Sequence, residues 1–347
     1  MKINNNKIKS LFLLSLAGSV LAKEEKANNQ TEITYSDGVR LNSLPQLATN
    51  LTKREDNSDP TLVFGGYPIN FVTSVTQDRY NCSFGFAVTY SEANDPSSCL
   101  LLDANPGLIT SAFCCAYGDC ASDENKVFTV SDNPVALGDV VVTSLCCLET
   151  HPDAVISAPD FALAGVDETT NVKLIPYVIG YNNSLYPITS FGSVPLGTWV
   201  CAYTPTNGYM CGVVDEIDIA GMYVLPGPSG PGERFSGYFT NVTDIVSIEL
   251  KNYTTYFPTD GFSAGGSVYT QTNVGDRTFA QLVGHVVEYA CGDNTCKSQY
   301  LYYSPVDKVI DIISAKYKCN YVPLVYNENN AQEYDQLIAQ VEIPTKK

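Results

Sequence analysis

Histidine is scarce in this chain, and the scarcity limits the chemistry that the protein can perform. Only His151 and His285 occur among 347 residues. Neither forms part of a recognisable metal-ligand motif, and sites for structural or catalytic zinc need clustered histidine, cysteine or carboxylate ligands. We therefore predict no bound metal, and no sequence motif indicates another cofactor.

Basic residues and long apolar runs are also few. Lysine and arginine number 20 against 37 acidic residues, which gives a formal net charge of -17. Nucleic acids and anionic membranes would repel such a chain, so neither is predicted as a partner. Beyond the first residues, no stretch is apolar enough to cross a bilayer, so no membrane span is predicted.

The first 22 residues have the features of a secretory signal peptide. Lys2, Lys7 and Lys9 precede the apolar run 11–21, and cleavage is expected after Ala22. The run is well short of the roughly 20 residues that a membrane anchor needs. We therefore expect the mature protein to be secreted into the extracellular space.

Cysteine is plentiful, with 12 residues. In a secreted chain most cysteines are expected to form disulfide bonds. The same route exposes the chain to N-glycosylation, and a glycoprotein is predicted. The acceptor sequons begin at Asn29, Asn50, Asn81, Asn182, Asn241 and Asn252.

Polar segments flank the central part of the chain. Residues 23–62 contain few aromatic residues, which predicts a flexible leader or a short pro-segment. Lys53-Arg54 within it is either a dibasic processing site or a chance pair. Residues 326–347 are predicted to form a polar tail with at most one weak helix.

The central part reads as an all-β domain. From Thr61, short runs rich in Val, Ile, Tyr, Phe and Thr recur every ten to fifteen residues, with Gly, Pro, Asn and Asp between them. This pattern is typical of antiparallel sandwiches and barrels. A helical period is sustained only over residues 305–317. The apolar positions that share one face of that helix are Val306, Val309, Ile310 and Ile313.

Seven segments, in order along the chain, carry a family resemblance. They are VFGG (63–66), NCSFGFAVTY (81–90), LITSAFC (108–114), APDFALAGV (158–166), VCAYTPTNGYMCG (200–212), GFSAGGSVY (261–269) and YLYYSPVDKVI (300–310). Together they resemble the chymotrypsin-like serine peptidases, in particular the branch similar to alpha-lytic protease. The resemblance covers roughly residues 63–318. It implies that residues 63–325 form two six-stranded antiparallel β-barrels, with the active-site cleft between them and a C-terminal α-helix.

The same resemblance places a defect in the catalytic triad. Phe113 stands where the family has its histidine, and a phenyl ring can neither accept nor donate the proton that this mechanism moves. Asp160 stands at the triad acid. Without the histidine it is a vestigial acid, and we expect its carboxylate to be hydrogen-bonded to neighbouring backbone.

The nucleophile loop fits the family in two registers, and the sequence leaves both open. In one, Ala264 replaces the serine; in the other, Ser263 occupies the nucleophile position. Both registers lose the buried aspartate of the family loop, and Ala202 stands where the branch has an arginine that pairs with it. Losing both avoids an unpaired buried charge.

The resemblance also implies a changed specificity pocket and a set of disulfides. Residues 281–290 resemble the strand that pairs with substrate, and Glu288 and Tyr289 occupy its end, where the tyrosine should narrow or fill the pocket. His285 is expected to be a packed or edge residue of that strand. The implied bonds are Cys82–Cys114 and Cys201–Cys211, with Cys291 as a substitute partner for Cys296. The other six cysteines cannot be paired from sequence.

The leading hypothesis is a secreted, catalytically inactive protein of trypsin-like fold that binds a protein, peptide or glycan. One alternative is an active serine endopeptidase of the same fold that uses Ser263. Another is a structural component of the extracellular matrix or cell wall. GFSAG (261–265) also fits the nucleophile elbow of α/β-hydrolases, but that elbow needs a following helix, and a β-type run follows here.

Overall fold

The computed structural model describes residues 60–72, 79–91, 106–115, 126–129, 135–144, 158–166, 170–205, 207–226, 237–251, 264–291, 299–317 and 319–339. The predicted signal peptide and nearly all of the predicted leader lie outside these ranges. So do Arg54, His151, Ser263 and Cys296. No helix within the described ranges is long and apolar enough to span a bilayer.

Nine strands form the first sheet. Their order is β1 (Thr61–Gly65), β9 (Val172–Ile179), β10 (Leu185–Phe191), β15 (Arg277–Cys291), β14 (Ser267–Val274), β11 (Trp199–Thr204), β12 (Gly208–Pro226), β13 (Gly237–Leu250) and β16 (Gln299–Pro305). β15 also pairs with β16, so the six strands from β15 to β16 close into an antiparallel ring. β10, β9 and β1 extend the sheet outside this ring, through parallel pairings of β10 with β15 and of β1 with β9.

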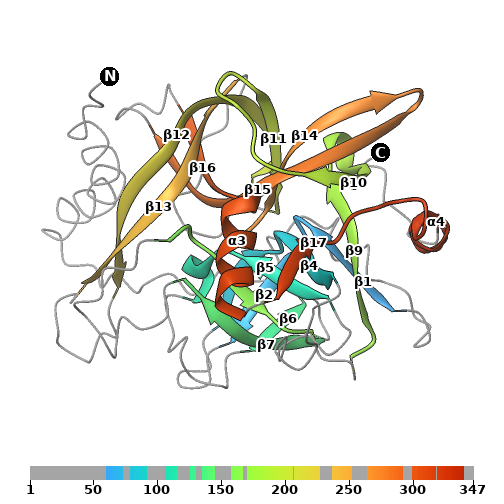
Figure 1. Cartoon of the computed structure of the whole chain (residues 1–347), viewed down its shortest axis with the longest axis horizontal. Coiled ribbons are helices and arrows are strands. Elements are labelled where there is room, and N and C mark those ends of the chain that lie inside the picture. The colour runs from blue at the N-terminus through green and yellow to red at the C-terminus, as the bar shows by residue number, and fades with distance from the viewer. Residues whose placement is uncertain are drawn as a thin grey trace, which may run out of the picture.

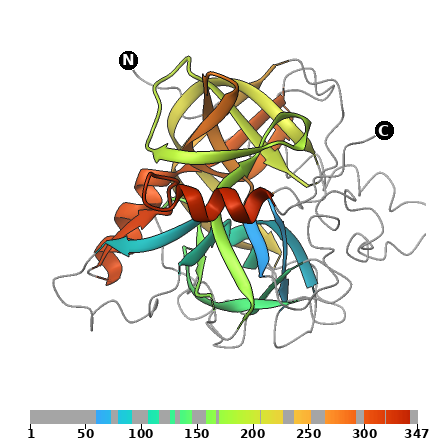
Figure 2. The ribbon, with the colours of Figure 1, turned by 90° about the vertical axis from the view of Figure 1, so that its right-hand side faces the viewer.

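Eight strands form the second sheet. Their order is β17 (Asn320–Pro323), β4 (Phe86–Ser91), β5 (Gly107–Thr110), β8 (Ala162–Ala164), β7 (Ala136–Thr143), β6 (Lys126–Thr129), β2 (Pro68–Val72) and β3 (Arg79–Ser83). β3 continues into β4 through Phe84 and Gly85. Counted as one bent strand, β3 and β4 therefore close a second antiparallel ring of six strands. In Figures 1 and 2 the ring of the first sheet forms the upper half and the second sheet the lower half, while β9 and β1 run down beside the second sheet.

Alternating side chains build the core of the first ring. Val200 and Ala202 of β11 point into a cluster that draws on all six of its strands, whereas the neighbouring Cys201 belongs to a different cluster. A single-residue alternation of this kind is what a strand with two distinct faces requires. The all-β fold closed by a helix is confirmed, because α3 (Val306–Tyr317) follows β16 directly. All four apolar positions predicted for its inner face are buried.

A C-terminal segment, residues 319–339, joins the two sheets. β17 pairs with β4 of the second sheet, and the Tyr326 amide donates to the Ile188 carbonyl of the first sheet at 2.6 Å. α4 (Ala331–Ala339) then packs against the first sheet, where Tyr334 is buried and Glu333 pairs with Lys173. Figure 2 shows α4 running across the junction between the two halves. Most of this segment falls within the stretch predicted to be a polar tail.

Asp335 is the polar centre of that attachment. Its carboxylate accepts hydrogen bonds from Tyr177 (3.0 Å), Tyr326 (2.8 Å) and Arg277 (2.7 and 3.3 Å). Partial burial works to raise the pKa of Asp335, but the bonds from Arg277, Tyr326 and Tyr177 outweigh it and lower the pKa. The carboxylate is therefore charged at neutral pH, and charge-assisted bonds of this kind are the stronger ones.

We expect Asp335→Ala to lower the free energy of unfolding by about 1–2 kcal/mol, because three donors lose their acceptor while solvent compensates part of the loss. Urea denaturation at neutral pH measures the change. Glu328→Ala, at an exposed position of the same segment, is the control and should shift the midpoint little. Equal shifts in both variants would contradict the role given to Asp335.

Candidate functional site

The predicted triad acid lies buried at the junction of the two sheets. Asp160 precedes β8 and is fully buried, and Ser111, at the end of β5, donates to its carboxylate at 2.5 Å. The acid thus has a serine hydroxyl as a partner, which the sequence did not indicate. Phe113 belongs to the short 3-10 helix η3 (Ala112–Cys115) that begins just after Ser111. Its side chain is not among those described.

His285 of β15 lies next to Asp160. Its ring is fully buried, 6.1 Å from the ring of Phe86. Burial lowers the pKa of His285 to about 3, and the nearby main chain of Asp160 opposes only part of this shift. Among the described residues, neither ring nitrogen meets a partner in full hydrogen-bond geometry, and the Asp160 main chain offers only a weak one. The imidazole is therefore neutral at physiological pH and packed, as expected for a core histidine.

No serine hydroxyl within the described ranges is paired with that imidazole. Ser267 and Ser304 stand opposite His285 on β14 and β16. The Ser267 hydroxyl donates to the Gly85 carbonyl instead, and Ser304 makes no bond to the ring. The serine–histidine pair that nucleophilic catalysis requires is not formed here.

The segment Ala264–Gly266 is wedged between β3, β5 and β15. The Ala264 carbonyl accepts from the Ser83 amide at 2.9 Å, and the Gly265 amide donates to the Val286 carbonyl at 2.7 Å. Gly265 has a φ of +95°, and a Cβ added there would lie 2.1 Å from the Ser83 oxygen. This backbone needs glycine. Ala264, one of the two candidates for the nucleophile position, is buried and carries only a methyl group.

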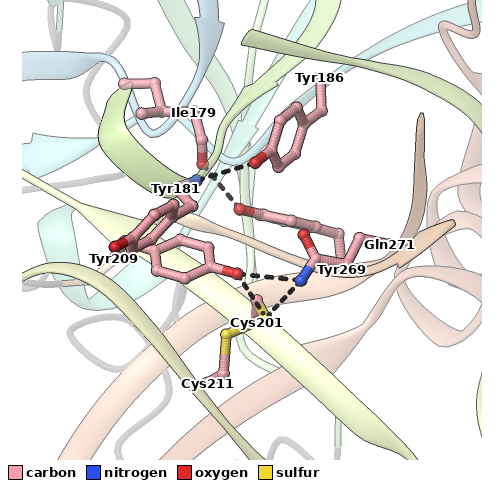
Figure 3. The surroundings of a disulfide bond; sticks show 8 residues. All are labelled: Ile179, Tyr181, Tyr186, Cys201, Tyr209, Cys211, Tyr269 and Gln271. Carbon is pink, nitrogen blue, oxygen red and sulfur yellow. Dashed lines mark hydrogen bonds between the residues drawn. A yellow bond between two sulfur atoms is a disulfide. The ribbon is translucent and has the colours of Figure 1, made fainter. Parts of the chain in front are cut away.

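Two of the three implied disulfides are present. Cys82–Cys114 ties β3 to η3, and Cys201–Cys211 ties β11 to β12 across directly paired positions. Figure 3 shows the second bond beneath a group of tyrosines. Cys291 ends β15, but its side chain is not described, and Cys296 lies outside the described residues, so their bond stays a prediction. Cys319 is also disulfide-bonded.

Other predicted positions fall in different settings. Glu288 and Tyr289 lie where β15 pairs with β16, and their side chains are not described. Asn182 lies in the short 3-10 helix η4 (Tyr181–Asn183), exposed and with a φ of +54°, a setting open to a glycan. Asn81 and Asn241 lie within β3 and β13. Asn29, Asn50 and Asn252 are outside the described residues.

Comparisons with known proteins find likeness in structure only. No family model and no curated protein matches the chain. Solved structures that resemble it are serine proteases, the class that the sequence motifs resemble. Protease A of Thermobifida fusca is 15% identical over 77% of this chain and 100% of its own, with a TM-score of 0.44. A Cellulomonas bogoriensis chymotrypsin is 17% identical over 76% and 100%, with a TM-score of 0.43.

A glutamic acid-specific serine protease gives similar values, with 16% identity over 76% of this chain and 100% of its own, and a TM-score of 0.45. Likeness at such low identity and TM-score says nothing about activity. The chemistry of this chain depends on its own side chains.

Proposed function

We propose that the protein is a secreted pseudo-peptidase of trypsin-like fold, which has lost catalysis and acts by binding another molecule. The observation that carries this proposal is the absence of a base–nucleophile pair at the described junction of the two sheets. Asp160 is bonded to Ser111, Ala264 has no hydroxyl, and the buried His285 bonds no serine.

The chemical requirements support this view. Acyl transfer by this mechanism needs a nucleophile, a base within hydrogen-bond reach of it and an acid that orients the base. A general base works best when its pKa is near the operating pH. Burial holds the pKa of His285 at about 3, far below that range. In a related mechanism, loss of the serine or the histidine alone costs roughly a millionfold in turnover.

Exposed aromatic side chains support binding as the remaining role. Tyr181, Phe191 and Trp199 are each more than a third exposed, although all three are large and apolar, and Leu196 between them is exposed too. Aromatic residues dominate the energetics of protein interfaces. All four lie within residues 181–199, on the segment from η4 through β10 to β11, so this part of the surface offers several apolar side chains to a partner.

A fluorophosphonate probe tests the loss of catalysis. We expect no adduct on the purified secreted protein, while an active trypsin-like enzyme labels fully under the same conditions. Circular dichroism establishes that the unlabelled protein is folded. An adduct on Ser263 that disappears in Ser263→Ala would overturn the proposal in favour of a serine endopeptidase. Retention in an insoluble wall or matrix fraction, with no soluble partner, would favour a structural role instead.

A further inference from the structure

Half of β14 has an edge without a strand partner among the described residues. β14 pairs with β15 along its whole length, but with β11 only through Tyr269 and Val268. Beyond Tyr269 the strand continues for five residues, Thr270–Val274, and all but the first of these are exposed. Figure 1 shows the β14–β15 hairpin leaving the body of the molecule and diverging from β11.

This edge lacks the usual protection. Natural sheet edges are blocked against further pairing by charged side chains, proline or bulges. Residues 270–274 read TQTNV, with no charge and no proline, and their register with β15 is regular. Val274 is 63% exposed. The edge is therefore available to another extended chain.

The pairing pattern shows which main-chain groups point outward. A two-residue turn, Gly275-Asp276, links Val274 to its partner Arg277. In such hairpins the flanking pair exchanges hydrogen bonds, and the following pairs alternate. The amide and carbonyl groups of Asn273 and Gln271 therefore face away from β15. Counting back by two from Gln271, the next residue whose main-chain groups should face away from β15 is Tyr269. Tyr269 does pair with β11 on that side, as expected.

Aromatic side chains flank this edge. Trp199, 46% exposed, lies two residues before Cys201, which pairs with Tyr269, so it stands at the level of Gln271 where the strands diverge. The Gln271 side chain donates to the Tyr209 hydroxyl at 3.1 Å, and Tyr181 packs edge-on against Tyr209 with ring centroids 5.7 Å apart (Figure 3). We refer to Tyr181, Trp199 and Tyr209 as the aromatic ledge.

We propose that the free edge of β14 binds an extended segment of another protein as an added strand, with the aromatic ledge contacting its side chains. The inference deepens the proposed binding function and rests on it. In strand addition, main-chain hydrogen bonds supply affinity and alternate side chains supply specificity. The aromatic ledge, next to the edge, is the surface that the side chains of the added strand would contact.

Charge identifies the partner as a basic segment and not a second copy of this chain. The formal net charge of -17 makes two copies repel each other. The same charge attracts a segment rich in lysine or arginine and accelerates its encounter. Residues 270–274 carry no charge, so pairing with the backbone of that segment leaves no charge of β14 buried without a partner.

Trp199 provides the test, because it is the only tryptophan in the chain. The probe is a capped heptapeptide of alternating lysine and valine, titrated into the full secreted protein while tryptophan emission is recorded. We expect a saturable blue shift that weakens as salt is added. Asn273→Pro removes one outward amide and should weaken binding at least tenfold. Asn273→Ala is the matched control. Like the proline variant it loses the 2.8 Å hydrogen bond from the Thr278 hydroxyl to the Asn273 side chain, but it keeps the main-chain amide, and it should bind within about twofold of the native chain.

Three results would overturn the inference. Equal binding by the proline and alanine variants, both folded by circular dichroism, would exclude pairing through β14. A dimer that Asn273→Pro dissociates in sedimentation would make a second copy the occupant. A shift with the soluble glucan laminarin, insensitive to Asn273→Pro, would make the ledge a glycan site. Labelling of Ser263 by the fluorophosphonate would refute the pseudo-peptidase proposal and leave the peptide result standing, so the two failures are distinguishable.

Discussion

Gly265→Ala is expected to destabilise the fold severely. The residue has a φ of +95°, and the added Cβ would lie 2.1 Å from the Ser83 oxygen and 2.2 Å from the Thr110 hydroxyl. The backbone cannot move away cheaply, because the Gly265 amide is bonded to Val286 on the opposite side. We expect a loss of more than about 4 kcal/mol, a large share of the stability of a typical domain. The yield of folded protein and the guanidinium midpoint measure the loss.

Gly275→Ala is the matched control. Gly275 also has a positive φ, +61°, but nothing lies within 4 Å of the Cβ that alanine would add. The variant should lose only about 1 kcal/mol, the cost of that backbone conformation. Similar small losses in both variants would show that the junction at Gly265 is less tightly packed than described.

His285 should make the protein sensitive to acid. Its pKa is about 3 in the folded chain and near 6.5 when unfolded, so below pH 6.5 the unfolded chain binds the extra proton. The stabilisation from a neutral His285 is complete above pH 6.5 and is lost progressively as the pH falls toward 3. Between pH 7.5 and pH 5 we expect a loss of about 2 kcal/mol from this residue.

Urea midpoints at several pH values, for the native chain and His285→Leu, separate this effect from that of the carboxylates. Leucine is close to histidine in size and does not titrate, so the variant should show a flatter profile from pH 7.5 to 5. Asp335 affects stability at lower pH. Folding lowers the pKa of its carboxyl group, so its contribution to the free energy of unfolding is lost only as the pH falls below the ordinary carboxyl pKa. Parallel profiles for the two proteins would contradict the burial of His285.

The sequence was informative where local pattern decides the structure. Alternating runs predicted the strands, four spaced apolar residues predicted the inner face of α3, and two implied cysteine pairs formed as expected. The motifs also singled out Asp160 and Ala264, and the structure buries both where the two sheets meet. These features depend on neighbouring residues or on motifs carried by the family resemblance.

What the sequence did not predict depends on contacts between distant segments. Nothing near His285 indicates Asp160, which is 125 positions away, as its neighbour. α4 has a single buried side chain, Tyr334. Asp335 finds two of its three donors on β9 and β15, 158 and 58 positions away. The free edge of β14 likewise depends on where β11 diverges from it, and the sequence of neither strand alone predicts that point.

The C-terminal segment makes unfolding a property of the whole domain. Since β17 holds one half and α4 the other, neither half can melt without releasing bonds that stabilise both, so heating should give a single cooperative transition. Proteases outside the cell cleave chains that open locally, at a rate set by the population of the open form. By suppressing independent opening of either half, the segment slows such cleavage and would lengthen the lifetime of the protein in the extracellular space proposed for it.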